Sequence, residues 1–283
     1  MKIYNLKKII YKYDIKFCKS LGQNFLFDEN ILKKIVKVSE VDKNTNVIEI
    51  GTGFGTLTKH IAKVCKKVVT IEIDKKLILI SEKILEDFKN IKIICEDVLK
   101  LNIKKIVEEE FKGEPFCVVA NIPYSITTPI IIKFLSSKLN IVSLTILMQK
   151  EVAQRLVADV GRKEYGSITV FTRYYSNSKI LFSVSPNCFI PKPTVKSALI
   201  KIKLLSKPSV IVNNEELFFS VVRASFKHRR KTLLNSLAIE FNIIKEKLLD
   251  VFLKVGLDEN VRGERLTVIE FGMLTNKLEL MYI

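Results

Sequence analysis

Four consecutive residues, Asn121-Ile122-Pro123-Tyr124, place a side-chain amide, a rigid turn and an aromatic ring directly after the apolar run 115–120. The side-chain oxygen of Asn121 and the backbone carbonyl of Ile122 can accept hydrogen bonds from the two N–H groups of one amine, because Pro123 restricts the carbonyl geometry. The ring of Tyr124 can stack on a base that has left its helix. These four residues are the candidate catalytic set, and a surface turn with an asparagine cap is the alternative.

A glycine-rich segment, Gly51-Thr-Gly53-Phe-Gly55, follows the apolar run 46–50. Glycines at this point let the backbone turn sharply and approach a ligand closely. The dinucleotide fingerprint is Gly-x-Gly-x-x-Gly, and here the third glycine comes one residue early, which disfavours a nicotinamide site. Any tight strand-to-helix turn is the other interpretation of this segment.

Acidic residues lie at the ends of the next two apolar runs. Glu72 lies 21 residues after Gly51 and can accept hydrogen bonds from both hydroxyls of a ribose. Asp97 can accept from the amino group of an adenine. Each acid alone fits a solvated strand end. Suitable groups at three successive strand tips favour a nucleoside bound across the carboxyl edge of a parallel sheet.

Apolar runs and helical periods alternate through the first part of the chain. Strands are predicted at 46–50, 67–73, 90–97, 115–120 and 143–148, and helices at 56–65, 75–88 and 149–160. This alternation is typical of an α/β fold whose parallel sheet is covered on both faces. Further strands are predicted at 180–184 and 197–205, and residues 165–176 fit either a helix or a strand.

A break at 207–214 separates this pattern from segments with helical periods at 216–226, 232–241 and 245–255. We therefore predict two domains, a ligand-binding domain at 1–208 and a small all-helical domain at 209–283. Residues 165–214 hold seven Lys or Arg and no Asp or Glu, and a second basic run covers 223–231. Because these stretches flank the break, we expect a basic cleft at the domain junction.

The composition points to a polyanionic partner. The 283 residues include 47 Lys and Arg against 30 Asp and Glu, a net charge of +17, and such an excess attracts nucleic acid. No segment fits a secretory signal or a membrane span. Five scattered cysteines without a Cys-x-x-Cys pair indicate reduced thiols in a cytoplasmic protein, and two histidines give little basis for a metal site.

The glycine loop, Glu72, Asp97 and the tetrapeptide together resemble class I methyltransferases. The tetrapeptide is similar to the Asn-x-Pro-Tyr/Phe box of enzymes that methylate the exocyclic amine of adenine. The resemblance implies a Rossmann-like sheet and S-adenosylmethionine as cofactor. It also implies that Asn121 and Ile122 make the amine nitrogen more tetrahedral while Tyr124 stacks on the flipped base. Catalysis would then be mostly positioning.

Residues 20–26, Ser-Leu-Gly-Gln-Asn-Phe-Leu, are similar to the Gly-Gln-Asn-Phe-Leu box of the KsgA family of ribosomal RNA adenine dimethyltransferases. Segments 188–198, 223–237 and 262–266 resemble further motifs of this family, so the resemblance covers about residues 16–275. It implies a set of residues around the methyl donor: Asn24, Leu26, Gly51, Gly53, Glu72, Asp97 and Asn121.

The family resemblance also implies a substrate, two adjacent adenosines in a hairpin near the 3′ end of 16S ribosomal RNA, presented by a small-subunit precursor to a monomeric enzyme. Tyr124, Arg229, Arg230 and Lys231 are expected to contact this RNA. Phe189 is expected to stack on the second face of the target base, and a packed loop aromatic is the alternative for it.

Three other functions remain open from the sequence. An Erm-type enzyme that methylates a large-subunit (23S) adenosine shares the glycine loop and the tetrapeptide, although the segment 226–237 favours the small-subunit family. A non-catalytic nucleic-acid-binding relative keeps the fold, but intact Asn121 and Tyr124 disfavour it. A nicotinamide oxidoreductase is disfavoured by the early glycine and by the basic excess.

Overall fold

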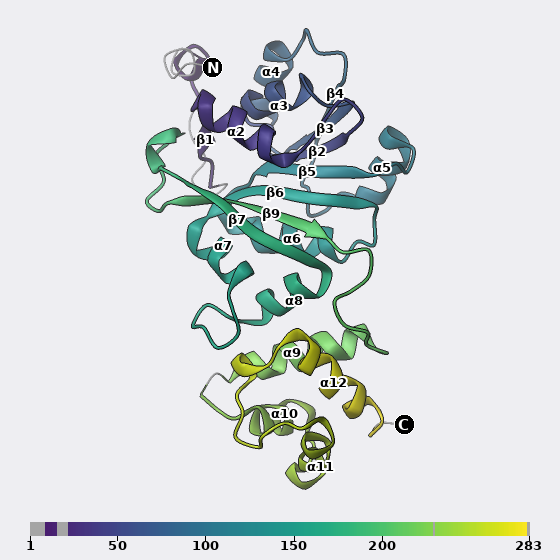
Figure 1. Ribbon diagram of the computed structural model, residues 1–283. Coiled ribbons are helices and arrows are strands. Elements are labelled where there is room, and N and C mark those ends of the chain that lie inside the picture. The colour runs from purple at the N-terminus through teal and green to yellow at the C-terminus, as the bar shows by residue number, and fades with distance from the viewer. Residues whose placement is uncertain (1–8, 16–21, 229, 282–283) are drawn as a thin grey trace. The chain divides into compact units, whose positions relative to one another are not determined.

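The computed structural model describes residues 9–15, 22–228 and 230–281 (Figure 1). The chain forms two compact units. Met1–Ala153 and Lys179–Leu204 make one, here called the sheet unit; Gln154–Ser178 and Leu205–Ile283 make the other, the helical unit. This partition differs from the predicted segments 1–208 and 209–283, because residues 154–178 cluster with the C-terminal helices.

Within the described residues, the main sheet has seven strands in the order β4-β3-β2-β5-β6-β9-β7. The pairs β2–β3, β3–β4, β2–β5 and β5–β6 are parallel, and β6–β9 is antiparallel. The strands are β2 (Asn46–Ile50), β3 (Lys67–Glu72), β4 (Ile91–Cys95), β5 (Phe116–Asn121), β6 (Ile141–Gln149), β7 (Ser176–Val184) and β9 (Ser197–Leu204). The predicted α/β fold is confirmed. The strand order reverses between β2 and β5, and ligands of such sheets bind at the carboxyl ends beside that point.

Helices cover both faces of the sheet, with α2 and α3 on one face and α6 on the other (Figure 1). These elements are α2 (Glu29–Ser39), α3 (Thr56–Ala62), α4 (Lys75–Ile84), α5 (Ile103–Phe111), α6 (Thr127–Leu135) and α7 (Lys150–Val157). Successive strand residues point to opposite faces. One face therefore buries Val47, Val119 and Leu147 against Leu32 of α2 and Ile61 of α3.

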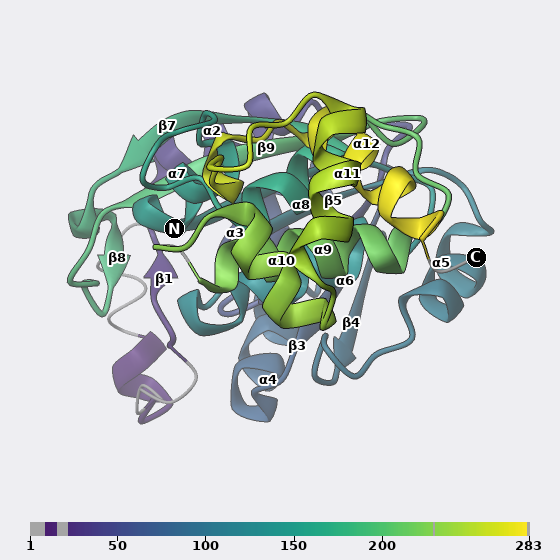
Figure 2. The ribbon, with the colours of Figure 1, turned by 90° about the horizontal axis from the view of Figure 1, so that it is seen from below.

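A two-residue antiparallel ladder joins distant segments of the sheet unit (Figure 2). Strand β1 (Phe25–Leu26) pairs with β8 (Phe189–Ile190), so that Phe25 faces Ile190 and Leu26 faces Phe189. Because side chains alternate along a strand, Leu26 and Phe189 enter the core beside α2, where they are 2% and 3% exposed. Phe25 points the other way and packs against Phe54, their ring centroids 4.5 Å apart.

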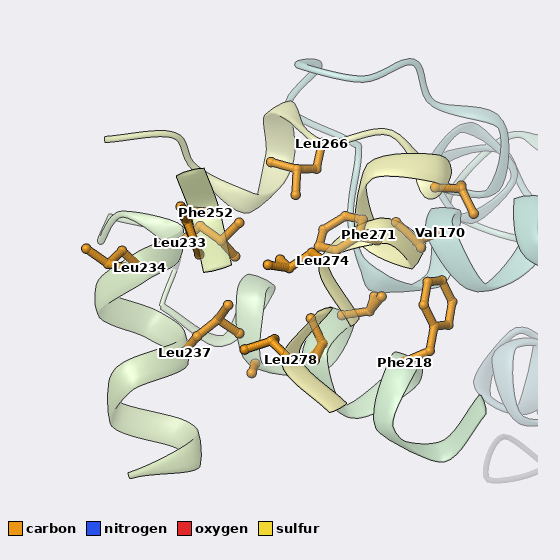
Figure 3. Close-up of a cluster of buried hydrophobic side chains, with 14 of the residues drawn as sticks. Val170, Phe218, Leu233, Leu234, Leu237, Phe252, Leu266, Phe271, Leu274 and Leu278 are labelled. Atoms are coloured by element: carbon orange, nitrogen blue, oxygen red, sulfur yellow. The ribbon is translucent and has the colours of Figure 1, made fainter. Parts of the chain in front are cut away.

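The helical unit contains α8 (Ser167–Tyr175), α9 (Glu215–Lys227), α10 (Leu233–Phe241), α11 (Lys245–Val255) and α12 (Val268–Glu279). The segment 165–176 is thus mostly helical, which resolves the ambiguity of its sequence. Val170 of α8 lies in one apolar cluster with Phe218 of α9 and Phe271 of α12 (Figure 3). Tyr165 is fully buried, and its hydroxyl donates to the Leu266 carbonyl at 2.8 Å. These contacts explain why residues 154–178 belong to this unit.

Two of the cations in the basic stretch 165–214 bind the protein's own carbonyls. The Lys201 ammonium is buried and donates to the carbonyls of Val38 and Ser39 at 3.1 and 3.4 Å. It also pairs with the Glu40 carboxylate at 2.7 Å, and this pairing lowers the pKa of Glu40. Arg173 donates to the Ala158 carbonyl at 2.8 Å. Both side chains are therefore engaged within their own units.

Among the described residues, no helix is both long and apolar enough to cross a membrane. The same residues hold no group of three or more His, Cys, Asp or Glu that could bind a metal ion.

Replacing Lys201 with Met keeps an unbranched side chain one atom shorter but removes the cation that satisfies the last carbonyls of α2. We expect the free energy of unfolding to fall by about 1–3 kcal/mol, the cost of leaving buried polar groups unpaired. Urea unfolding measures the change. Lys203→Met alters an exposed lysine of the same strand and is the control. Equal stability of the two variants would contradict the role of Lys201.

Candidate active site

A cavity of about 260 Å³ lies at the carboxyl ends of β2, β3 and β5. Every residue assigned above to catalysis lines it, and so does every residue assigned to the methyl donor except Leu26. The topology explains this convergence, because the parallel strands β3, β2 and β5 end at the same edge of the sheet. Residues more than a hundred positions apart in the sequence thus surround one space.

The glycine loop runs close against two walls of the cavity. Gly51 and Gly53 have φ angles of 82° and 54°, in the left-handed region that side chains disfavour. A Cβ added to Gly53 would lie 3.1 Å from the Phe25 ring, and one added to Gly51 would lie 3.4 Å from the Asn121 carbonyl oxygen. Both the backbone conformation and the space therefore require glycine at Gly53, and the conformation alone requires it at Gly51.

Three backbone N–H groups fix the carboxylate of Glu72. Gly53 donates to Oε2 at 2.9 Å, while Ile73 and Asp74 donate to Oε1 at 2.9 and 3.0 Å. Burial raises the pKa of Glu72, and these hydrogen bonds act against that rise. Two carboxylate oxygens can accept about four hydrogen bonds, so the group keeps capacity for a ligand hydroxyl.

The loop after β4 places Asp97 on the same cavity. Its Oδ1 accepts the N–H of Leu99 at 2.9 Å, and its second oxygen can accept from a ligand amino group. Lys133 of α6 secures this loop by donating to the carbonyls of Leu99 and Leu101 at 2.8 and 2.7 Å. The sequence analysis missed Lys133, since no local pattern connects it with residues some thirty positions earlier.

The side chain of Asn121 has its orientation set by a carbonyl. Its Nδ2 donates to the backbone oxygen of Asn24 at 3.1 Å. Because a carbonyl only accepts hydrogen bonds, the amide nitrogen must face it, and Oδ1 is left as the acceptor for another group. The residue before Asn24 is also fixed by a distant partner. The side-chain amide of Gln23 donates to the Asp74 carboxylate at 3.0 Å.

Tyr124 begins the short 3₁₀ helix η2 (Tyr124–Ile126) that leads into α6. Its hydroxyl is hydrogen-bonded to the hydroxyl of Ser197 in β9, with 2.7 Å between the oxygens. Burial raises the pKa of Tyr124, so the phenol keeps its proton. The ring lines the cavity and is anchored at its far end.

Two expected site residues lie elsewhere. Leu26 and Phe189 face each other across the β1–β8 ladder and are buried in the core beside α2. The burial of Phe189 fits its alternative as a packed loop aromatic, and its stacking on a target base stays a prediction. Phe25, one residue before Leu26, supplies the apolar wall of the cavity instead.

The basic residues expected to contact RNA belong to the helical unit. Arg230 and Lys231 are exposed, and Arg229 lies outside the described residues. Whether they join the basic stretch 165–214 in one cleft stays a prediction.

A carboxyl group lies buried in β2, just before the glycine loop. Glu49 is 0% exposed and accepts a hydrogen bond from the Thr58 hydroxyl at 2.5 Å. Its Oε1 has no hydrogen-bond partner among the described residues. Burial raises the pKa of Glu49 to about 8, so the neutral form dominates at neutral pH.

Residues 15–278 match a family model described as ribosomal RNA adenine dimethylase. The protein named Ribosomal RNA small subunit methyltransferase A from Alkaliphilus oremlandii (strain OhILAs) is 48% identical over 273 residues, which cover 96% of this chain and 95% of that protein. Its namesake from Clostridioides difficile (strain 630) is 42% identical over 270 residues, with 95% and 93% covered.

Solved structures share the fold. A dimethyladenosine transferase from Plasmodium falciparum superposes with a TM-score of 0.75 at 25% identity, covering 91% of this chain and 98% of that chain. The 23S rRNA methyltransferase ErmE gives a TM-score of 0.70 at 24% identity, covering 90% and 99%. The predicted class I methyltransferase sheet is confirmed.

The buried Glu49 makes stability depend on pH in a definite direction. Its folded pKa of about 8 lies above the ordinary value of 4.5, so folding favours the protonated form. The stability that this group contributes is present below pH 4.5 and is lost as pH rises toward 8. Glu49→Gln cannot ionise, and we expect it to gain stability relative to the parent protein by roughly 1 kcal/mol per pH unit across this window.

Urea unfolding of the ligand-free protein from about pH 5.5 to about pH 8 measures this difference. Glu114→Gln changes an exposed acid of the same unit and serves as the control. Parallel pH profiles for Glu49→Gln and the parent protein would contradict a raised pKa at Glu49.

Proposed function

Because the chain belongs to the ribosomal RNA adenine dimethylase family, we propose that it transfers methyl groups from S-adenosylmethionine to the exocyclic amines of adenosines in the RNA of the small ribosomal subunit. It is an rRNA adenine dimethyltransferase, like the relatives that it matches over almost its whole length. The observation that carries the proposal is the side-chain oxygen of Asn121, set free beside a cavity that also holds the Glu72 carboxylate.

The residues of the cavity suit S-adenosylmethionine. Glu72 keeps acceptor capacity for a ribose hydroxyl, and Asp97 offers an acceptor for the amino group of the base. Gly51 and Gly53 bring the backbone close to the ligand, while Phe25 adds an apolar wall. When bound, this cofactor supplies a methyl group activated by the positive charge on its sulfur.

The exocyclic amine of adenine is a poor nucleophile, because its lone pair is delocalised into the ring. Asn121 Oδ1 accepts one N–H of this amine, and the Ile122 carbonyl, restricted by Pro123, accepts the other. Acceptors held out of the plane of the ring favour a more tetrahedral nitrogen with an available lone pair. The proton leaves afterwards to water, and Tyr124 stacks on the flipped base. The rate then depends mainly on positioning.

The substrate follows from the family and from charge. The proposed targets are two adjacent adenosines in a hairpin near the 3′ end of 16S ribosomal RNA, each converted to N6,N6-dimethyladenosine. A small-subunit precursor in the cytoplasm would present them to a monomeric enzyme. The net charge of +17 and the exposed Arg230 and Lys231 support contacts with RNA phosphates.

The rival functions receive less support. The small-subunit relatives are 42% and 48% identical to this chain, whereas the 23S enzyme is 24% identical and shares the fold alone. Membership of an adenine dimethylase family also disfavours a nicotinamide oxidoreductase. A non-catalytic relative would have no need for the amide orientation observed at Asn121.

Isolated small and large ribosomal subunits that lack these methyl groups provide the test. We expect the purified protein to methylate small-subunit RNA and to leave large-subunit RNA unmodified, as judged by mass spectrometry of the digested RNA. Asn121→Ala removes the free acceptor, and we expect at least about a hundredfold loss of transfer with donor affinity changed far less.

Asn102→Ala replaces an exposed asparagine that caps α5 outside the cavity, and it is the matched control. Methylation confined to the large subunit would refute the proposed substrate. Near-normal turnover by Asn121→Ala would refute the catalytic role of its amide.

Reversing the charge of Arg230 and Lys231 to Glu should weaken binding to the small subunit, because each lost phosphate contact also lowers the number of released counterions. We expect a shallower dependence of the affinity on salt, measured as log Kd against log salt concentration, with the affinity for S-adenosylmethionine unchanged. The control reverses Lys245 and Lys247, two exposed lysines of α11 in the same unit. If both double variants weakened binding to the small subunit equally, the change would reflect net charge, and a specific role of Arg230 and Lys231 would be contradicted.

A further inference from the structure

Ser197 lies in the family-like segment 188–198 but has been given no role so far, and it forms the one hydrogen bond described for the Tyr124 hydroxyl. Building on the proposed function, we propose that Ser197 is a positioning residue. By holding the Tyr124 hydroxyl, it fixes the ring against which the target adenine stacks, and so raises the rate of methyl transfer.

The position of Ser197 is itself well determined. It is the first residue of β9, is 0% exposed, and lies opposite Gln149 in the antiparallel ladder with β6. The next residue pair continues this connection, since the N–H of Lys150 donates to the Lys196 carbonyl at 2.9 Å. The hydroxyl of Ser197 therefore comes from a sheet strand bonded to a neighbour, which is a rigid place for an anchor.

The position of Tyr124 is less constrained by the main chain. It starts a 3₁₀ helix of three residues directly after Pro123, and its side chain is only half-buried at the edge of the cavity. Packing alone therefore covers only part of the ring. The hydrogen bond to Ser197 adds a second fixed point at the far end of the side chain.

A side chain held at both ends loses much of its freedom to swing about χ1, so the place of the ring is set before the base arrives. The step in which adenine is flipped and aligned then no longer includes the entropy loss of ordering the Tyr124 side chain. The amine must reach Asn121 Oδ1 while its base lies on this ring, so a tilted ring would displace the amine. The hydroxyl thus acts through ring orientation, and its raised pKa agrees with a protonated group that serves as an anchor and not as a base.

This role predicts coupling between Ser197 and Tyr124. Ser197→Ala removes the anchor and Tyr124→Phe removes the anchored group while keeping the ring, so both break the same bond. We expect each variant, and the double variant, to transfer methyl groups about fivefold more slowly than the parent protein in single-turnover assays on small subunits, the value of one neutral hydrogen bond. The Kd for S-adenosylmethionine should stay within about twofold, because this bond does not touch the donor residues.

Ser143→Ala is the matched control, since it removes another buried serine hydroxyl from the same sheet, one bonded to Cys117 in β5. It should change thermal stability and leave the transfer rate unaffected. If Ser197→Ala fails to fold, Tyr124→Phe alone decides the question through its transfer rate and donor affinity.

Additive losses in the double variant, or single variants as fast as the parent protein, would overturn the positioning role while leaving the proposed function intact. A parent protein that methylates no small-subunit RNA would overturn both.

Discussion

The chemistry proposed for this site depends on a single hydrogen bond, from the Asn121 side chain to the Asn24 carbonyl. An amide has one accepting end and one donating end, and only the donating end can face a carbonyl. The bond therefore decides which atom of the amide faces the cavity. With the amide reversed, the two N–H groups of Asn121 would oppose the N–H groups of the adenine amine in the proposed reaction.

Backbone groups supply most of the order around the cavity. The Glu72 carboxylate is held by three main-chain N–H groups, the Asn121 amide by a main-chain carbonyl, and the loop that carries Asp97 by a lysine bonded to two carbonyls. The main-chain partners of Glu72 and Asn121 persist when most side chains at their own positions are replaced, whereas the anchor of the Asp97 loop is the Lys133 side chain. The fold thus sets the positions of these groups, and only a few side chains are left to contact a ligand.

Local patterns in the sequence were enough to predict the sheet and most of its strands, because apolar periodicity and glycine turns are short-range signals. The same reasoning located Glu72, Asp97 and Asn121 at strand ends. It failed where a distant partner decides the outcome. Whether Phe25 or Leu26 faces the cavity depends on pairing with β8, some 160 residues later, and nothing near residue 26 specifies that register.

The same limit explains the other differences. The predicted stacking role of Phe189 takes no account of its position opposite Leu26, and the predicted basic cleft draws on a stretch that includes Lys201, which is buried against the end of α2. The 154–178 segment was assigned by its place in the chain, whereas the apolar side chains of Tyr165 and Val170 assign it to the helical unit. Contacts between residues far apart in the sequence decide these outcomes, and local patterns in a single sequence do not predict such contacts.

The path of the chain has a consequence for the independence of its parts. It passes between the two units three times, after Ala153, after Ser178 and after Leu204. A fragment ending near residue 208 would keep Tyr165, Val170 and Tyr174 but would lack most of their apolar neighbours, and would expose them to water. The helical unit therefore cannot be cut off as a C-terminal fragment: an exchange of this unit between relatives would have to carry residues 154–178 along with the C-terminal helices.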